Sequence, residues 1–182
     1  MRAFHLPSRA FRVLAIVSVL CLVSVCAASG SYRFGFAGDL GFAQDFIFGE
    51  GSNSIQIDLR AMVSDEFQVR IPLGISLNGP SFMAEAGLFV LYYPWKTGPF
   101  MGLSVFQFGF TCGSCDLENM INLNEVTVGW TFEFGPGLFV EPSLSIRDPS
   151  GTFSDEYSGI KGVFPCYTVF RGRLSFGWYF WR

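Results

Sequence analysis

The chain has 182 residues and a formal net charge of −3; half of its residues are hydrophobic, 18% are aromatic and 15% are charged. This length fits one domain, and the charged fraction lies below the roughly 25% of soluble domains. No cluster of basic residues indicates nucleic-acid binding, and beyond the first thirty residues no apolar run approaches the roughly 20 residues of a membrane-spanning helix.

Residues 1–27 are predicted to be a secretory signal peptide, and residues 28–182 the mature domain. Arginines precede the apolar stretch Val13–Val25, and small residues allow cleavage after Ala27. A lipoprotein signal with a modified Cys26 is the alternative. Removal of the leader takes three of the 12 basic residues and none of the 15 acidic ones, so the mature chain has a net charge of −6.

The leader also contains His5, the single histidine of the sequence. Without it, the mature chain cannot form a Ser-His or Asp-His pair or a histidine-containing metal site. We therefore expect neither catalytic residues nor a metal or cofactor site, and the protein is not predicted to be an enzyme.

Eight segments of the mature chain alternate apolar and polar residues with the period of two that is typical of a β-strand. They cover approximately residues 32–42, 55–63, 67–77, 82–93, 100–111, 125–134, 138–147 and 167–180. In the last of them, aromatic residues alternate with arginine, serine and glycine. An aromatic face on a terminal strand invites aggregation in water, but it suits a barrel that is closed by this strand and surrounded by lipid. The predicted fold is an all-β, eight-stranded, antiparallel, up-and-down transmembrane β-barrel.

Three kinds of irregularity occur inside these segments. The apolar parity of the fifth segment changes near Val105, which predicts a β-bulge. Pro72 and Pro142 each remove a backbone donor from a strand interior, and we expect local bulges there as well. Single glycines such as Gly129 are predicted to provide space in a narrow interior.

Connection lengths indicate how the barrel is oriented. Three connections are tight turns, namely Ser64–Glu66, Pro94–Pro99 and Gly135–Gly137. On the opposite side, three connections are long, namely Ala43–Asn53, Cys112–Asn122 and Asp148–Cys166, while Asn78–Ser81 is short. Short periplasmic turns and longer external loops are the pattern of outer-membrane barrels.

A soluble lipocalin-like barrel is the alternative architecture, because it also has eight alternating strands. A soluble surface normally carries many charged side chains of both signs. The mature chain has only two lysines, Lys96 and Lys161, and its polar faces are rich in glycine, serine and threonine. These features favour the membrane barrel.

The C-terminal stretch Phe176-Gly177-Trp178-Tyr179-Phe180 resembles the signal that the barrel-assembly machinery reads, through Phe176, Trp178 and Phe180. With its strand pattern, the mature chain resembles the small eight-stranded outer-membrane barrels of the OmpX and OmpW type. The resemblance implies a monomeric integral protein of the cell outer membrane, with outer-membrane lipid and the assembly machinery as partners. Members of this group differ in function: some mediate surface attachment, and others allow small apolar solutes to pass.

Charged residues on the polar faces are equally divided between the two signs. The set comprises Arg33, Arg60, Arg70, Arg147, Arg171 and Arg173 with Asp39, Asp58, Glu85, Glu125, Glu133 and Glu141. Eight strands leave an interior just wide enough for side chains, and buried charges are tolerated when they are paired. The set is therefore predicted to be an ion network that fills the lumen, with Asp39 and Glu141 as partners of Arg173; a conduction or binding path is the alternative.

The long loops suggest two further features. Cys112, Cys115 and Cys166 are predicted to form one disulfide in an oxidising compartment, and the choice among the three stays open. Aromatic residues beside acidic ones, namely Phe46, Phe48, Phe153 and Tyr157, are predicted to contact an extracellular partner. The functional hypothesis is surface contact or an envelope structural role, and the alternative is an OmpW-like passive channel for small apolar solutes near Phe89, Leu91 and Phe106.

Overall fold

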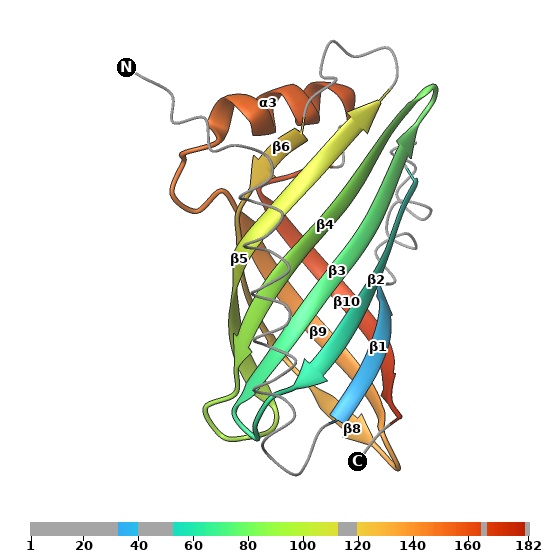
Figure 1. The fold of residues 1–182 in the computed structure, drawn as a ribbon, viewed down its shortest axis with the longest axis vertical. Helices are drawn as coiled ribbons and strands as arrows, with labels where there is room; N and C mark the ends of the chain where they lie inside the picture. The colour runs from blue at the N-terminus through green and yellow to red at the C-terminus, as the bar shows by residue number, and fades with distance from the viewer. Residues whose placement is uncertain (1–32, 40–52, 113–119, 165–166, 181–182) are drawn as a thin grey trace, which may run out of the picture.

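The computed structural model describes residues 33–39, 53–112, 120–164 and 167–180, and its strands form a closed antiparallel β-barrel (Figure 1). The strands are β1 (Arg33–Asp39), β2 (Asn53–Met62), β3 (Phe67–Asn78), β4 (Ser81–Tyr92), β5 (Pro99–Cys112), β6 (Met120–Leu123), β7 (Glu125–Trp130), β8 (Phe132–Phe134), β9 (Leu138–Arg147) and β10 (Phe170–Tyr179). β6, β7 and β8 are successive pieces of one barrel strand, so the barrel has eight, and the predicted fold is confirmed.

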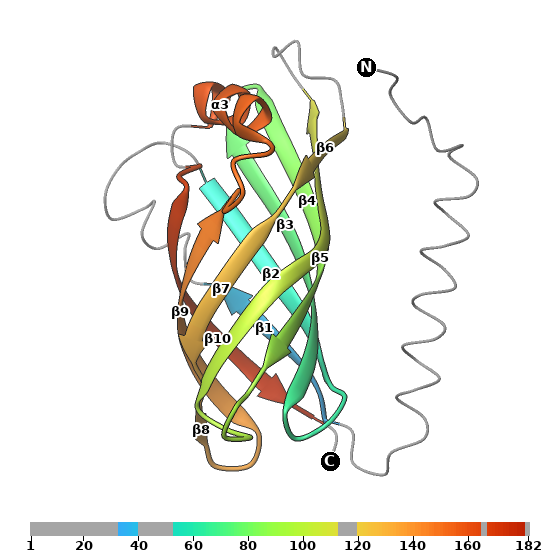
Figure 2. The ribbon, with the colours of Figure 1, turned by 90° about the vertical axis from the view of Figure 1, so that its left-hand side faces the viewer.

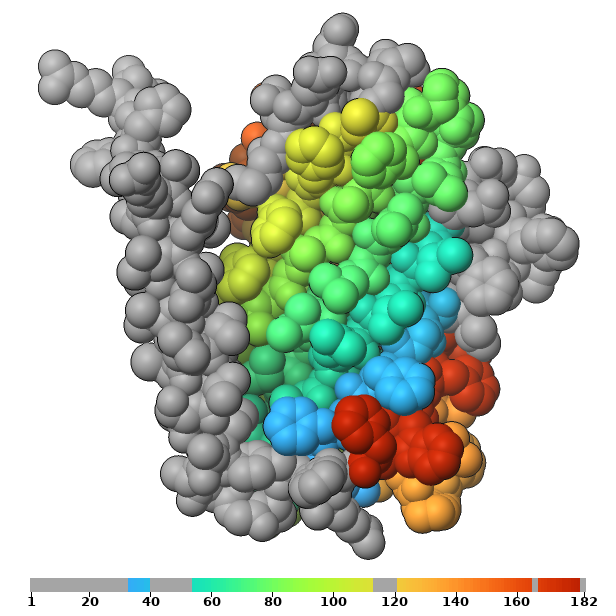
Figure 3. Space-filling view, turned by 45° about the vertical axis from the view of Figure 1, so that its right-hand side comes forward, coloured from blue at the N-terminus to red at the C-terminus, as the bar shows by residue number. Residues whose placement is uncertain are grey.

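The barrel closes where β1 pairs with β10, in a register that places Phe36 opposite Trp178. In the space-filling view of Figure 3, the blue side chains of β1 lie against the red ones of β10. This pairing gives the terminal strand a partner on each side, because β9 pairs with its other edge.

Alternation along the strands places apolar side chains outside the barrel and polar ones inside. In β10, Phe176 and Trp178 are 50% and 48% exposed, whereas Arg173, on the opposite face of the same strand, is 7% exposed. The same holds in β2, where Ile57 and Leu59 are exposed and Asp58 is buried. A water-soluble barrel has the reverse arrangement, so this is the side-chain distribution of a transmembrane barrel.

A β-bulge lies at Val105, as predicted. Leu88 of β4 pairs with Phe106 of β5, and the next residue, Phe89, pairs with Ser104, so Val105 has no partner in this register. The extra residue keeps the apolar side chains of β5 on the outer face before and after the bulge. Val105 and Phe106 are both exposed there.

The predicted bulges at the prolines are wrong. Between β3 and β4 the same register continues from Arg70–Phe89 to Leu73–Ala86, across Pro72. Pro142 of β9 lies opposite the break between β7 and β8, and the register is again unchanged on the two sides. The missing proline donor therefore interrupts the hydrogen-bond ladder without inserting a residue.

Two of the connections predicted as loops contain regular structure. β6 begins within Cys112–Asn122, ends one residue after it and extends the wall beside β5. Helix α3 (Ser154–Val163) lies within Asp148–Cys166 and crosses the upper end of the barrel, as Figures 1 and 2 show from two sides. We use "upper" for this end and "lower" for the end with the short turns. Within the described ranges, no helix has the length and apolar character needed to cross a membrane.

The charges at the two ends of α3 are compatible with a helix. Asp155 and Glu156 lie in its first turn and Lys161 in its last, which matches the helix dipole. The Asp148 carboxylate accepts a hydrogen bond from the backbone N–H of Phe153 at 3.2 Å, just before the helix begins.

Candidate functional site

The lower part of the lumen is filled by aromatic and aliphatic side chains. One cluster contains Ala37, Phe139 and Tyr179, and the centres of the last two rings are 4.6 Å apart. A second cluster consists of Phe89, Leu91, Tyr93 and Phe100. These side chains occupy the lumen near the short turns.

Two glycines make room for these rings. A β-carbon at Gly177 would collide with the Phe139 ring and with the backbone oxygen of Phe36, and one at Gly129 would lie 2.5 Å from the Phe100 ring. The prediction that Gly129 provides space in a narrow interior is therefore confirmed.

The central part of the lumen holds a compact group of four charged side chains, which we call the central cluster: Asp58, Arg60, Arg70 and Glu141. Arg60 Nη1 donates to Glu141 Oε2 at 2.7 Å, and Arg70 Nη2 donates to Glu141 Oε1 at 2.6 Å. Arg60 Nη2 also reaches Asp58 Oδ2 at 3.2 Å. All four residues are at most 2% exposed, so the charges are screened from solvent and neutralised by one another.

Above it lies a second group, the upper cluster: Asp39, Glu125, Arg147, Arg171 and Arg173. Arg173 lies between two carboxylates, with its Nε 3.6 Å from Asp39 Oδ2 and its Nη2 3.7 Å from Glu125 Oε1. Arg171 Nη2 is 3.3 Å from the same Asp39 oxygen. Both arginines also donate to Gln56 Oε1.

The remaining charged residues of the predicted network lie elsewhere. Arg33 and Glu133 form a two-bond pair, at 2.9 and 3.1 Å, that is partly exposed at the lower end. Glu85 is half-buried and makes no guanidinium contact within 4 Å among the described residues. The expected pairing of Arg173 with Glu141 is wrong, because Glu141 forms its ion pairs with Arg60 and Arg70.

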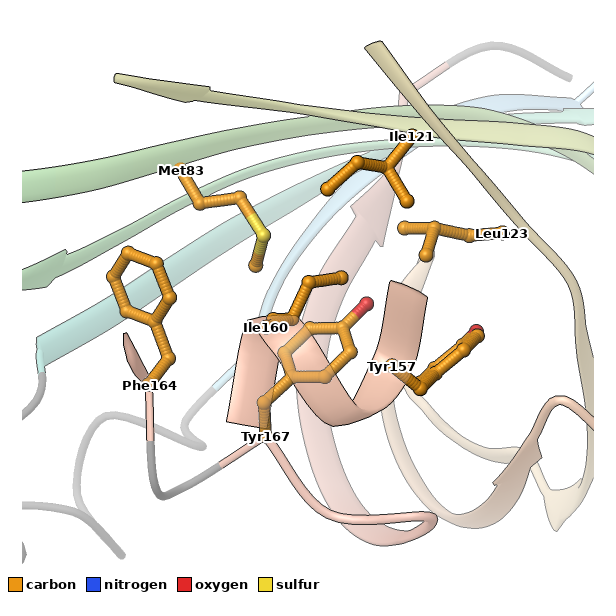
Figure 4. Packing of buried hydrophobic residues seen from close by; sticks show 7 residues of the cluster. All are labelled: Met83, Ile121, Leu123, Tyr157, Ile160, Phe164 and Tyr167. Carbon is orange, nitrogen blue, oxygen red and sulfur yellow. The ribbon is translucent and has the colours of Figure 1, made fainter. Parts of the chain in front are cut away.

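An apolar group, the mouth cluster, packs at the upper end of the lumen, and Figure 4 shows it from close by. It comprises Met83, Ile121, Leu123, Tyr157, Ile160, Phe164 and Tyr167. Two polar contacts accompany the packing: Tyr157 Oη donates to the Asn124 carbonyl oxygen at 2.9 Å, and Asn78 Nδ2 donates to that of Val163 at 2.6 Å. Helix α3 is thus held on the barrel by its buried face.

The predicted surface contact through Tyr157 is wrong, because its ring is 6% exposed and points into the mouth cluster. Phe153 also packs partly against that cluster. Phe46 and Phe48 lie outside the described residues. The spacing of Tyr157, Ile160 and Phe164, at intervals of three and four residues, is the signal of an amphipathic helix that sequence reasoning missed.

The side chains of the predicted solute path do not line one passage. Phe89 and Leu91 are buried in the lower apolar filling, whereas Phe106 is on the outer face and 36% exposed. Phe176, Trp178 and Phe180, predicted as an assembly signal, share the outer face of the terminal strand and the residue after it.

Cys112 at the end of β5 is exposed and has a free thiol, while Cys115 and Cys166 lie outside the described residues, as do the leader and Cys26. In the part of the chain that the structure describes, no group of three or more His, Cys, Asp or Glu side chains is placed to hold a metal ion.

Comparison with known proteins gives a structural likeness. No protein-family model and no curated protein sequence matches the chain. Among solved structures, the N-terminal β-barrel domain of Pseudomonas aeruginosa OprF matches with a TM-score of 0.52 and 10% sequence identity, over 82% of this chain and 97% of that domain. At this identity the likeness concerns the fold: the chain has the same kind of eight-stranded barrel. The resemblance to the OmpX and OmpW group stays a prediction.

Proposed function

We propose that the protein is an integral outer-membrane barrel with a filled, non-conducting lumen, which serves as a rigid scaffold for contacts made at its upper end. The outer face of the barrel supports a membrane location. On this face, every barrel strand exposes large apolar side chains, for example Phe36, Ile57 and Leu174. Buried charges face inward. In lipid this arrangement is favourable, and in water it would expose a continuous apolar surface.

One observation carries the proposal for the lumen. Glu141 is 0% exposed and binds two arginines that reach it from β2 and β3, so the ion pairs cross the lumen. The mouth cluster lies above this contact and the aromatic filling lies below it. An ion would have to displace side chains at three levels in order to pass.

The export route and partners follow from the same proposal. The leader 1–27 directs the chain to the periplasm, and the barrel-assembly machinery inserts it as a monomer. At the upper end, the exposed face of α3 carries Asp155 and Glu156. We propose that this acidic surface contacts an extracellular partner with basic groups.

Conductance of the folded protein in a planar lipid bilayer tests the closed lumen. We expect no steady current, and a steady current from the wild-type protein would overturn the proposal. Surface contact is tested separately with the double variant Asp155→Lys and Glu156→Lys, which should reduce attachment of cells that display the protein. The matched control changes Asp65 and Glu66 in the lower turn, which should leave attachment unchanged.

A further inference from the structure

One carboxylate of each charged cluster, Glu141 in the central cluster and Glu125 in the upper cluster, differs in how closely guanidinium groups approach it. In the central cluster, the guanidinium–carboxylate contacts of Glu141 are 2.6 and 2.7 Å. In the upper cluster, Arg147 Nε is 3.8 Å from Glu125 Oε2 and Arg173 Nη2 is 3.7 Å from Glu125 Oε1. The shorter distances are those of charge-assisted hydrogen bonds, and the longer ones exceed hydrogen-bond range.

These long contacts leave several buried polar atoms of the upper cluster without a hydrogen bond. Within the described part of the chain, this applies to both carboxylate oxygens of Glu125 and to the Nε atoms of Arg147 and Arg173. The Nε atoms of Arg60 and Arg70 in the central cluster also have no partner, so the Glu125 carboxylate is what distinguishes the upper cluster. The three residues are 1%, 3% and 7% exposed. Buried polar atoms without partners are unfavourable, so the upper cluster has both donors and acceptors that a bound molecule can satisfy.

The charge balance within contact distance favours an anion. Three guanidinium groups, those of Arg147, Arg171 and Arg173, share the two carboxylates of Asp39 and Glu125. By contrast, the central cluster has two guanidinium groups on two carboxylates. Among the groups within 4 Å, guanidinium groups therefore outnumber carboxylates by one, and Glu85 acts on Arg147 and Arg171 from beyond that distance.

An anion that satisfies both kinds of atom needs charged oxygens for the arginines and an O–H group for Glu125. The inorganic hydrogen phosphate ion has both, because it keeps a proton at neutral pH, whereas sulfate has oxygens but no proton. We propose that the upper cluster is a binding site for inorganic phosphate. Arg147 and Arg173 donate to the phosphate oxygens, and Glu125 accepts the phosphate O–H.

The route to this site is from the upper end. The central cluster forms its floor, and the barrel wall separates it from lipid, so α3 and the mouth cluster must move aside for entry. The contact of Arg147 with the ring of Tyr167 connects the site with the mouth cluster. The site binds its ligand without passing it through the barrel, so it is independent of the proposed closed lumen.

Isothermal titration of the folded, detergent-solubilised protein with inorganic phosphate and, separately, with sulfate tests the site. We expect saturable binding of phosphate that is at least about tenfold tighter than binding of sulfate, because sulfate leaves the buried Glu125 acceptor unpaired. In Glu125→Gln, the side-chain amide donates to either anion, so this preference should fall to within about twofold. The matched control is Glu133→Gln at the lower end, which should keep the preference.

Equal and salt-sensitive binding of the two anions would mean an adventitious ion only, and it would overturn the proposal. If the wild-type protein shows no binding, the variant Ile160→Asp, in which α3 is expected to leave the mouth, is titrated in the same way. Phosphate binding there would support a site behind a closed mouth, and its absence there would overturn the site. A bilayer current would instead count against the closed lumen alone.

Discussion

The guanidinium carbon of Arg147 lies 3.6 Å from the centre of the Tyr167 ring, and this cation–π contact joins the charged lumen to the mouth cluster. Arg147 is also 3.8 Å from Glu125 in the upper cluster, and Tyr167 packs in the same group as Ile160 of α3. The position of the helix and the order of the lumen charges are therefore coupled through one arginine.

The tyrosines of the mouth should make α3 sensitive to alkaline pH. Burial raises the pKa of Tyr157 and of Tyr167 above the ordinary value of 10.0, and the nearby Arg147 acts in the opposite direction with a smaller effect. A raised folded-state pKa means that their contribution to stability is complete below pH 10 and is lost as the pH rises through the folded-state values.

We therefore expect α3 to leave the mouth only above pH 10. The ultraviolet absorbance of tyrosinate, recorded during a titration of the folded barrel, measures this. Tyr157→Phe cannot ionise, so in this variant the change should move to higher pH. Titration of both tyrosines near pH 10 in the wild-type protein would contradict the prediction.

Replacing Arg173 by Leu should destabilise the barrel. Asp39 and Glu125 would each lose a guanidinium neighbour inside the lumen. Loss of one partner of a buried ion pair costs about 3–5 kcal/mol, so the heat-modifiable gel shift of the folded barrel should occur at a lower temperature.

Arg33→Leu is the matched control for this experiment, because its pair with Glu133 is partly exposed. Such pairs contribute about 0–1 kcal/mol, and the gel shift should change little. Equal shifts for the two variants would mean that Arg173 is not in a buried environment.

The glycine at position 177 should not tolerate a side chain. In Gly177→Val, the new atoms would meet the Phe139 ring and the backbone of the neighbouring strand β1. Overpacking typically costs about 1–3 kcal/mol, and the backbone contact leaves little room for relief. Gly172→Val in the same strand is the control, since a β-carbon there meets nothing within 4 Å. Refolding yield on the gel shift assay should fall for the first variant and stay unchanged for the second.

The number of free thiols tests the disulfide prediction. Cys112 has a free thiol in the structure, so a disulfide among the three cysteines of the mature chain would join Cys115 and Cys166. Alkylation of the exported, unreduced and denatured protein should then label one cysteine per chain, and peptide mapping should place the label on Cys112. Three labelled cysteines would exclude the disulfide.

The barrel could be predicted from sequence because period-two alternation is a local property of each strand. Even the bulge at Val105 appeared as a change of parity within β5. Side-chain pairing across the lumen could not be predicted in this way. Arg173 lies on β10 between β1 and β9, yet one of its carboxylates comes from β7. Its position depends on the width of the lumen and the tilt of the strands, which no local pattern contains.

Helix α3 was missed for a different reason. Its apolar stripe is short, and the same stretch holds Asp155, Glu156 and two glycines, Gly159 and Gly162, which are typical of a polar loop. The helix is favoured because the barrel mouth offers an apolar surface made by Met83, Ile121 and Leu123. Tertiary packing therefore decides the local structure here.

Because α3 depends on packing against the mouth, the substitution Ile160→Asp should release it. Ile160 is 0% exposed at the centre of the mouth cluster, and removing a buried aliphatic side chain of this size costs about 2–5 kcal/mol. We expect α3 to separate from the mouth while the barrel stays folded, because the central cluster does not contact Ile160. Lys161 is the next residue and is exposed, so trypsin should cut after it much faster once the helix is released.

The control for this experiment is Ser158→Asp, which places the same charge on the exposed face of α3 and should leave the rate of cleavage after Lys161 unchanged. Bilayer recordings on Ile160→Asp then separate the mouth from the lumen. With α3 released, the ion pairs of Glu141 with Arg60 and Arg70 still cross the barrel, so the variant should remain without steady current. Rapid cleavage together with a steady current would mean that α3 alone closes the barrel, and that the charges below it leave an open path.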